Sequence, residues 1–154
     1  LQKAVHLASF TNYPIIADDS GLVVDALNGE PGVYSARYAG DESNDDDNID
    51  LLLHRMTQEK NRKAYFHCSL IYLDPNDTSN PVLIETQWHG IICSEKSGHK
   101  GFGYDPIFFI PELDKTSAEL SVHEKNEYSH RGQAMKLLIE RLKEDNLISL
   151  KENL

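Results

Sequence analysis

The sequence predicts an α/β layered fold with a mixed β-sheet for this chain of 154 residues. Three observations support this class. Apolar residues recur with helical spacing around residue 50 and again around residue 138. Apolar and polar residues alternate in two segments joined by a turn-forming stretch, as in a β-hairpin. Helical and strand-like segments then follow one another along the chain, without repeats or low-complexity stretches.

Composition places the chain among ordinary globular proteins. Hydrophobic residues make up 40% and charged residues 26%, and 15 basic against 25 acidic residues give a net charge of −10. Such an acidic chain is a poor candidate for binding nucleic acids or anionic membranes, and no apolar run reaches the length of a membrane span. We therefore expect a single domain over residues 1–154, without nucleic-acid or membrane partners. The cysteines Cys68 and Cys93 read as buried thiols, which favours a cytoplasmic location.

The first half of the chain is expected to contain a helix, a strand, a loop and a second helix. The helix over residues 1–10 begins at Leu1 without an N-cap, so we expect the chain to be the C-terminal portion of a longer protein. A short strand over residues 14–17 leads into Asp-Asp-Ser-Gly, and residues 28–42 read as a loop. Ser43 is expected to cap the second helix, with the acidic residues 45–47 in its first turn. A metal site is the alternative interpretation of that acidic run.

The second half is expected to form a hairpin, another strand and the last helices. The strands 64–73 and 82–92 flank a turn over residues 74–81, which predicts a loop longer than two residues. The histidines on these strands, His67 and His89, read as structural or surface residues. A strand-like stretch over 104–110 and two capping boxes follow, Thr116 with Glu119 and Ser121 with Glu124. Ser129 opens the last helix, whose predicted apolar face comprises Met135, Leu138, Ile139 and Leu142.

A pair of carboxylates is the first candidate for chemistry. Asp18 and Asp19 are adjacent on a predicted strand, so their side chains point to opposite faces and only one can face a cleft. Ligands of α/β sheets tend to bind at strand ends, and a carboxylate there can hold Mg²⁺ or orient a water. An ordinary turn after the strand is the alternative interpretation.

A glycine-rich stretch is the second candidate. Phe102 lies between Gly101 and Gly103, where its flat ring could stack on a planar ligand such as a base. Asp105 precedes Pro106 and is held extended. The alternative is a glycine-rich turn with Phe102 packed into the core.

A basic cluster is the third candidate. His130 and Arg131 fall in the first turn predicted for the last helix, where the helix dipole disfavours cations, and Lys125 lies just before the cap. Residues that break a local rule tend to mark function, although surface basic residues are the alternative. No zinc-ligand spacing, phosphate-binding P-loop or nucleophile elbow occurs in the sequence.

Several long motifs, in order, resemble the inosine triphosphate pyrophosphatase family, which hydrolyses triphosphates of noncanonical purines. They are ADDSGLVVDALNGEPGVYSARYAG, GFGYDPIFF and KTSAELSVHEKNEYSHRGQA. The resemblance runs from about residue 3 to about residue 138. It implies an elongated fold with a long mixed sheet, Maf-like in general architecture, a cleft between two lobes and a homodimer.

The resemblance also implies the site residues. Asp19 would be the proton acceptor and a Mg²⁺ ligand. The substrate would contact Lys3 in the helix before the ADDSG motif, and further residues in the three motifs: Ser20, Phe102, Gly103, Tyr104, Asp105, Lys125, His130 and Arg131. The family's opening strand, its phosphate loop and a following Glu that helps hold Mg²⁺ are not found in these residues, which agrees with the uncapped helix at Leu1.

The reaction implied is attack of water on the α-phosphorus of a nucleoside triphosphate, with diphosphate leaving. Arg131 carries only hydrogen-bond donors, so a base with a C6 carbonyl is expected to pair with it better than adenine does. Two other readings stay open: a Maf-like pyrophosphatase with another base preference, and a catalytically impaired nucleotide-binding module.

Overall fold

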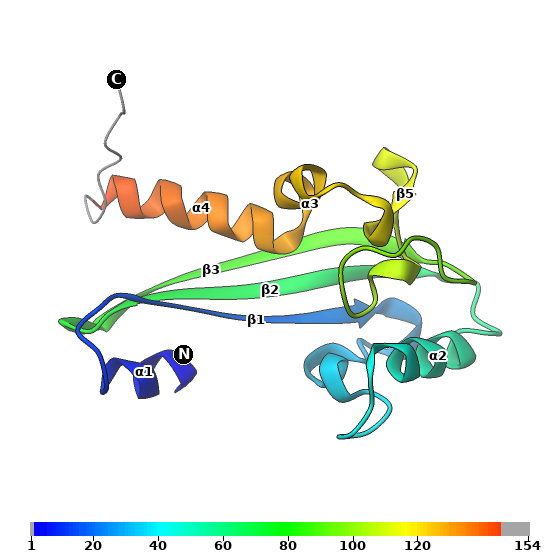
Figure 1. Cartoon of the computed structure of the whole chain (residues 1–154), viewed down its shortest axis with the longest axis horizontal. Helices are drawn as coiled ribbons and strands as arrows, with labels where there is room; N and C mark the ends of the chain where they lie inside the picture. The colour runs from blue at the N-terminus through cyan, green and yellow to red at the C-terminus, as the bar shows by residue number, and fades with distance from the viewer. Residues whose placement is uncertain (1, 146–154) are drawn as a thin grey trace.

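The computed structural model describes residues 2–145 and, of Lys3, the backbone only. A five-stranded antiparallel sheet carries α4 on one face and α1 on the other (Figure 1). Its strands pair in chain order: β1 (Ile15–Val24), β2 (Lys63–Asp74), β3 (Asp77–Ile92), β4 (Phe108–Ile110) and β5 (Lys115–Thr116). The helices are α1 (Gln2–Ala8), α2 (Asp45–Arg55), α3 (Val122–Tyr128) and α4 (His130–Glu144). Short 3₁₀ turns link them: η1 (Asp25–Leu27), η2 (Gly32–Arg37), η3 (Asp105–Ile107), η4 (Pro111–Leu113) and η5 (Ser117–Glu119).

The layered α/β class is confirmed. The four pairings among the described strands are all antiparallel, so the parallel pairing expected of a mixed sheet does not occur there. Each of these strands turns back beside its predecessor, and the right-handed crossover that a parallel neighbour needs is missing from the described topology. Within residues 2–145 no helix is both long enough and apolar enough to cross a lipid bilayer.

The first strand is longer than predicted. The sequence placed Asp18 and Asp19 at a strand end, but β1 continues to Val24 and pairs with β2 over its whole length. Backbone hydrogen bonds hold the strand, so polar side chains do not end it. Glycine is required at Gly21, because a Cβ there would lie 2.5 Å from the carbonyl oxygen of Gly32.

The hairpin between β2 and β3 is tighter than predicted. Asp74 pairs directly with Asp77, leaving a two-residue link, and the register shifts between Tyr72 and Asp74. The Asp74 carboxylate accepts the backbone N–H of Asn76 at 2.8 Å, a side-chain turn that the residue pattern alone did not reveal. The polar stretch 77–81 therefore extends β3 instead of forming a loop.

Three local predictions shift by a few residues. Asn44, not Ser43, caps α2: Asn44 and Asp47 exchange side-chain to backbone hydrogen bonds at 2.9 and 3.0 Å. The strand predicted over 104–110 is confined to β4, because residues 105–107 form a 3₁₀ turn around Pro106. The acidic run 45–47 starts a helix, as expected.

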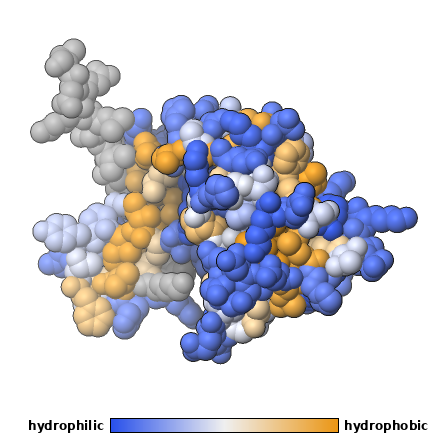
Figure 2. All heavy atoms as spheres, turned by 45° about the vertical axis from the view of Figure 1, so that its right-hand side comes forward, coloured by the Kyte–Doolittle hydropathy of each residue, from blue (hydrophilic) through white to orange (hydrophobic). Residues whose placement is uncertain are grey.

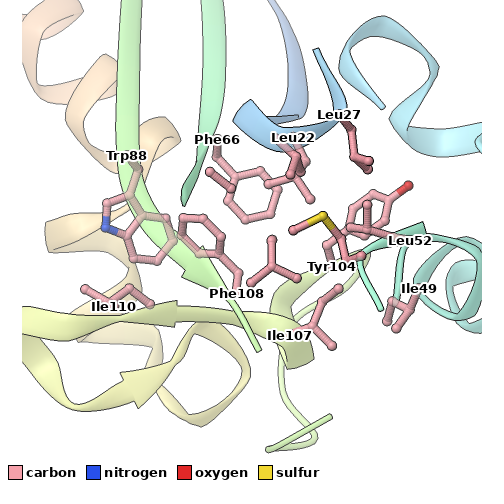
Figure 3. Close-up of a cluster of buried hydrophobic side chains, with 14 of the residues drawn as sticks. Leu22, Leu27, Ile49, Leu52, Phe66, Trp88, Tyr104, Ile107, Phe108 and Ile110 are labelled. Carbon is pink, nitrogen blue, oxygen red and sulfur yellow. The ribbon is translucent and has the colours of Figure 1, made fainter. Parts of the chain in front are cut away.

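The main core lies where the sheet meets α2 and the β4 region (Figure 3). Leu22, Phe66 and Trp88 lie opposite one another on three adjacent strands and are buried. Phe108 packs its ring edge against Phe66 at a centroid distance of 4.6 Å. A second cluster joins Cys68, Leu70 and Tyr72 of β2 to Ala134, Leu138 and Leu142 of α4. This cluster fixes α4 over the sheet and so places its first turn beside the aromatic core.

The buried face of α4 differs from the prediction. Leu138 and Leu142 are buried with Ala134, whereas Met135 and Ile139 are 41% and 37% exposed. Met135 and Ile139 are therefore wrongly predicted core residues; they lie on the adjacent stripe of the helix and line a cavity. Hydrophobic side chains also reach the surface in separate patches elsewhere (Figure 2).

Candidate active site

A cavity of about 940 Å³ opens between β1, the loop 100–105, α3 and the start of α4. Most of its lining is apolar, from the aromatic core and α4, with polar groups at a few positions. Eight of the ten sequence-predicted site residues line it: Ser20, Phe102, Gly103, Tyr104, Asp105, Lys125, His130 and Arg131. The other two are Lys3, whose side chain lies outside the described residues, and Asp19, which is not part of the lining.

The Asp105 carboxylate holds the glycine-rich loop 100–105 in place. This buried carboxylate accepts the backbone N–H of Phe102 at 2.9 Å and the hydroxyl of Ser117 at 2.7 Å, and forms an ion pair with Lys125. Gly101 has φ +80°, and a Cβ there would overlap the Asp105 carboxylate. The carboxylate therefore fixes the loop backbone and ties it to α3.

Two residues that the sequence analysis did not select hold the other side of this loop. Asp45, at the start of α2, accepts the backbone N–H of Gly103 at 2.7 Å. The hydroxyl of Tyr104 donates to the carbonyl oxygen of Ser35 at 2.8 Å, and burial raises the pKa of this phenol well above its usual value. The acidic run at α2 was a visible signal for Asp45. No sequence signal pointed to Ser35, because Ser35 and its partner Tyr104 are 69 residues apart in the chain.

Phe102 presents its ring to solvent at the cavity. Phe102 is 61% exposed, so the alternative interpretation that placed its ring in the core is wrong. The Lys125 ammonium lies 4.9 Å and the Arg131 guanidinium carbon 5.3 Å from the ring centroid. An exposed aromatic ring with two cations close to it is a platform on which a planar, electron-rich group can stack.

The Arg131 guanidinium has a carboxylate partner. Its Nε–H donates to Asp18 at 2.7 Å. This pair offsets the unfavourable position of a cation in the first turn of α4. The interpretation of His130 and Arg131 as unrelated surface basic residues does not hold, because His130 is buried and Arg131 contacts Phe102.

Two buried polar atoms at the cavity have no partner among the described residues. They are the hydroxyl of Ser20 and Nδ1 of His130. The His130 ring stacks on Phe66 at a centroid distance of 4.9 Å. Burial, with Arg131 nearby, lowers the pKa of His130 to about 4, so the imidazole is neutral at pH 7. Unpaired buried polar atoms are costly, which makes both atoms natural partners for a polar ligand.

Asp18 and Asp19 lie on opposite faces of the sheet. Asp18 pairs with Leu70, whose side chain packs under α4, so Asp18 lies on the α4 face of the sheet, where it contacts Arg131 of the cavity lining. Asp19 faces the other side, where its neighbour Ala17 packs in the cluster formed with α1. The resemblance implies a role for Asp19 and none for Asp18, yet Asp18 is the one of the two that lies on the α4 side. Strand geometry predicts only that the two side chains oppose each other, because which face α4 covers depends on the tertiary fold.

The Asp19 carboxylate is exposed and makes no ion pair or hydrogen bond with another described residue. Within residues 2–145 no three His, Cys, Asp or Glu side chains gather as a metal cluster. Mg²⁺ commonly uses one or two protein carboxylates together with substrate phosphates and waters, so the exposed carboxylate of Asp19 suffices for that mode. The Asp18 carboxylate is already paired with Arg131.

A family model and sequence relatives both match nearly the whole of this chain. The Ham1 family model matches residues 1–141. A dITP/XTP pyrophosphatase of Pectobacterium atrosepticum is 52% identical over 143 residues, which cover 92% of this chain and 73% of the relative. One of Nitrosomonas europaea is 47% identical over 148 residues, covering 96% and 73%.

Solved structures agree with the sequence relatives. A HAM1 protein from Coxiella burnetii superposes with a TM-score of 0.87 at 43% identity, covering 93% of this chain and 74% of that one. The Staphylococcus aureus Ham1 protein gives a TM-score of 0.86 at 44% identity, covering 93% and 73%. Together with the motifs around Asp19, Phe102 and Arg131, these matches show that the chain belongs to the Ham1 family.

Proposed function

We propose that the protein hydrolyses triphosphates of noncanonical purines, those of inosine, deoxyinosine and xanthosine, to the monophosphate and diphosphate. The observation that carries this proposal is the exposed Phe102 ring, which lines the 940 Å³ cavity and has the cationic groups of Lys125 and Arg131 close to it. Relatives named dITP/XTP pyrophosphatase, about half identical to this chain, support the same activity.

The base would stack on Phe102 and place its polar edge in the cavity. There the unpartnered Ser20 hydroxyl and the neutral His130 ring can each exchange a hydrogen bond with it. The Arg131 Nε–H is used by Asp18, so its terminal amino groups are the donors left for a ligand. A C6 carbonyl accepts such a bond, whereas the amino group of adenine would leave the guanidinium unpaired. This arrangement supports selection against adenosine triphosphate.

The phosphates would pass around the edge of β1 to the face that carries Asp19. β1 is the outermost of the described strands on its side of the sheet, and Asp19 directly precedes Ser20 of the cavity lining. A nucleotide can therefore reach both faces across one strand. We place Lys3 with the phosphates on the same side, because its helix α1 packs against β1. Cations are needed there, since the chain carries a net charge of −10.

Asp19 has two chemical roles in this proposal. It would hold Mg²⁺, whose charge offsets the negative charge of the phosphate oxygens. It would also orient the attacking water and accept its proton as the water oxygen bonds to the α-phosphorus. The bond to the leaving diphosphate breaks in the same displacement. One carboxylate can serve both needs, and Asp18 takes no part in the proton transfer.

Product analysis tests the proposal. Purified protein with inosine triphosphate and Mg²⁺ should give inosine monophosphate and diphosphate in equal amounts, seen by ³¹P NMR without inosine diphosphate. Asp19→Asn should remove most turnover while leaving the circular dichroism spectrum unchanged, because an amide is a poor metal ligand and a poor proton acceptor. Binding of inosine monophosphate without any turnover would favour the nucleotide-binding module instead. Turnover confined to other bases would favour a Maf-like pyrophosphatase.

We further propose a homodimer and a cytoplasmic location, without nucleic-acid or membrane partners. Large apolar side chains exposed at Phe10, Tyr13 and Leu83 support self-association. The two thiols, Cys68 and Cys93, are free in the structure, in keeping with a reducing compartment. Sedimentation velocity should show a particle of twice the chain mass, and a concentration-independent monomer would refute the dimer.

A further inference from the structure

We propose that Asp18 is a positioning residue for base selection: its carboxylate holds the Arg131 guanidinium beside Phe102, with the terminal amino groups turned to the ligand. This inference rests on the proposed function and adds a residue to it. The family motifs imply a role for its neighbour Asp19 and none for Asp18. The register of β1 against β2 turns Asp18 toward α4.

Two contacts restrain the guanidinium from different directions. Asp18 accepts the Nε–H at 2.7 Å, and the guanidinium carbon lies 5.3 Å from the centroid of the Phe102 ring. No hydrogen bond engages the terminal amino groups with any residue in the described part of the chain. The side chain is thus fixed through Nε and keeps its other donors available. Arginine carries considerable rotamer entropy, so restraining it beforehand reduces the cost of ordering it when a ligand binds.

A second cation beside the Phe102 ring is held in the same way. Lys125 is held by the carboxylate of Asp105. The two carboxylates differ in what else they support. Asp105 is buried and also holds the loop backbone and Ser117, whereas Asp18 is partly exposed and its carboxylate pairs with Arg131 alone among the described residues. Removing Asp18 therefore tests positioning without dismantling the loop.

The chemical step lies on the other face of the sheet, at Asp19. Loss of the Asp18 carboxylate should weaken base binding and base selection and leave turnover of the bound substrate largely unchanged. For Asp18→Ala we expect the KM for inosine triphosphate to rise about tenfold, with kcat within about twofold. The preference for inosine over adenosine triphosphate should fall, because an unrestrained guanidinium can turn away from the adenine amino group.

The matched control is Asp145→Ala. Asp145 accepts the Nε–H of Arg141 at 3.0 Å, which is the same kind of pair on the same helix, at its far end. This variant should keep the KM, the kcat and the base preference of the unmodified protein. Asp18→Glu keeps the charge and should recover part of the lost affinity.

A double-mutant cycle decides whether Asp18 acts through Arg131. In an Arg131→Ala background, Asp18→Ala should change kcat/KM by less than about twofold, because the group it positions is gone. An equal loss in both backgrounds, or no loss of affinity in the Asp18→Ala protein, would overturn the inference. If the unmodified protein does not hydrolyse inosine triphosphate, the proposed function fails by itself. The same cycle is then measured by calorimetric titration with inosine monophosphate. A tenfold loss of affinity on Asp18→Ala that occurs only when Arg131 is present supports the inference. An equal loss of affinity with Arg131 and with Ala at position 131 refutes it.

Discussion

The ammonium of Lys125 pairs with the buried carboxylate of Asp105, and this contact ties α3 to the loop that carries Phe102. The same carboxylate accepts bonds from Ser117 and from the loop backbone, so one side chain joins three segments of the chain. The geometry of the candidate base platform therefore depends on Asp105.

Asp105→Ala should destabilise the protein substantially. It leaves Lys125 and the Ser117 hydroxyl without their buried partner, and breaking such a pair from one side costs about 3 kcal/mol. Urea unfolding at pH 7 measures the loss. The partly exposed pair removed by Asp145→Ala should cost less than about 1 kcal/mol. Equal losses for the two variants would contradict the anchoring role of Asp105.

Gly101→Ala should disturb the same loop by steric overlap. Its φ is +80°, and the added Cβ would meet the Asp105 carboxylate. Gly32→Ala is the control, since Gly32 has φ +55° but nothing within 4 Å of the added atom. The free energy of unfolding of the Gly32→Ala control should fall by about 1 kcal/mol, because alanine is strained in the left-handed backbone conformation. That of Gly101→Ala should fall clearly more. Urea unfolding of both variants gives the comparison, and similar losses would show that the overlap is relieved without cost.

Phe102→Ala should weaken nucleotide binding without weakening the fold. The ring is 61% exposed, so its removal should change the free energy of unfolding by no more than about 0.5 kcal/mol. Loss of one base-stacking contact should raise the Kd for inosine monophosphate by about tenfold or more. Phe102→Tyr should retain binding, and Tyr13→Ala is the control at another exposed aromatic residue. Calorimetric titration measures all three, and unchanged binding by Phe102→Ala would exclude stacking there.

Stability should fall as the solution is acidified below neutral pH. Burial lowers the pKa of His130 to about 4 from a usual 6.5. Between these two values the imidazole is protonated in the unfolded chain but neutral in the folded protein. The stabilisation is thus complete above pH 6.5 and is lost progressively toward pH 4. Between pH 7 and pH 5 this group should account for about 2 kcal/mol. His130→Gln should remove this part of the pH dependence, whereas His89→Gln, on an exposed strand position, should keep it. Urea unfolding at both pH values checks the difference.

Local patterns predicted those elements whose signals lie within a few residues. The capping residues Ser121 and Ser129, the acidic start of α2 and the alternation of β2 were all recognisable. Each depends on contacts between residues three or four apart, or on the two-residue period of a strand.

Features set by distant partners were not predictable in this way. Which of Asp18 and Asp19 faces the cavity depends on where α4 packs, and the exposure of Met135 depends on how α4 is rotated over the sheet. Ser35 hydrogen-bonds to Tyr104, and Ser117 hydrogen-bonds to Asp105. No short motif predicts these two contacts. The family motifs selected eight residues of the cavity lining, but not the carboxylate that holds Arg131.

In the proposed function, Phe102, His130 and Arg131 form a base site that distinguishes purines by their C6 substituent. The most direct measurement is kcat/KM for inosine triphosphate against adenosine triphosphate, with the same enzyme, Mg²⁺ concentration and diphosphate readout. The Arg131 guanidinium is partly exposed in the free protein, but a bound base would cover it. A covered donor left unpaired should cost the adenine substrate about 3 kcal/mol, so we expect a kcat/KM ratio of about a hundred or more in favour of inosine. Comparable values for the two substrates would contradict it.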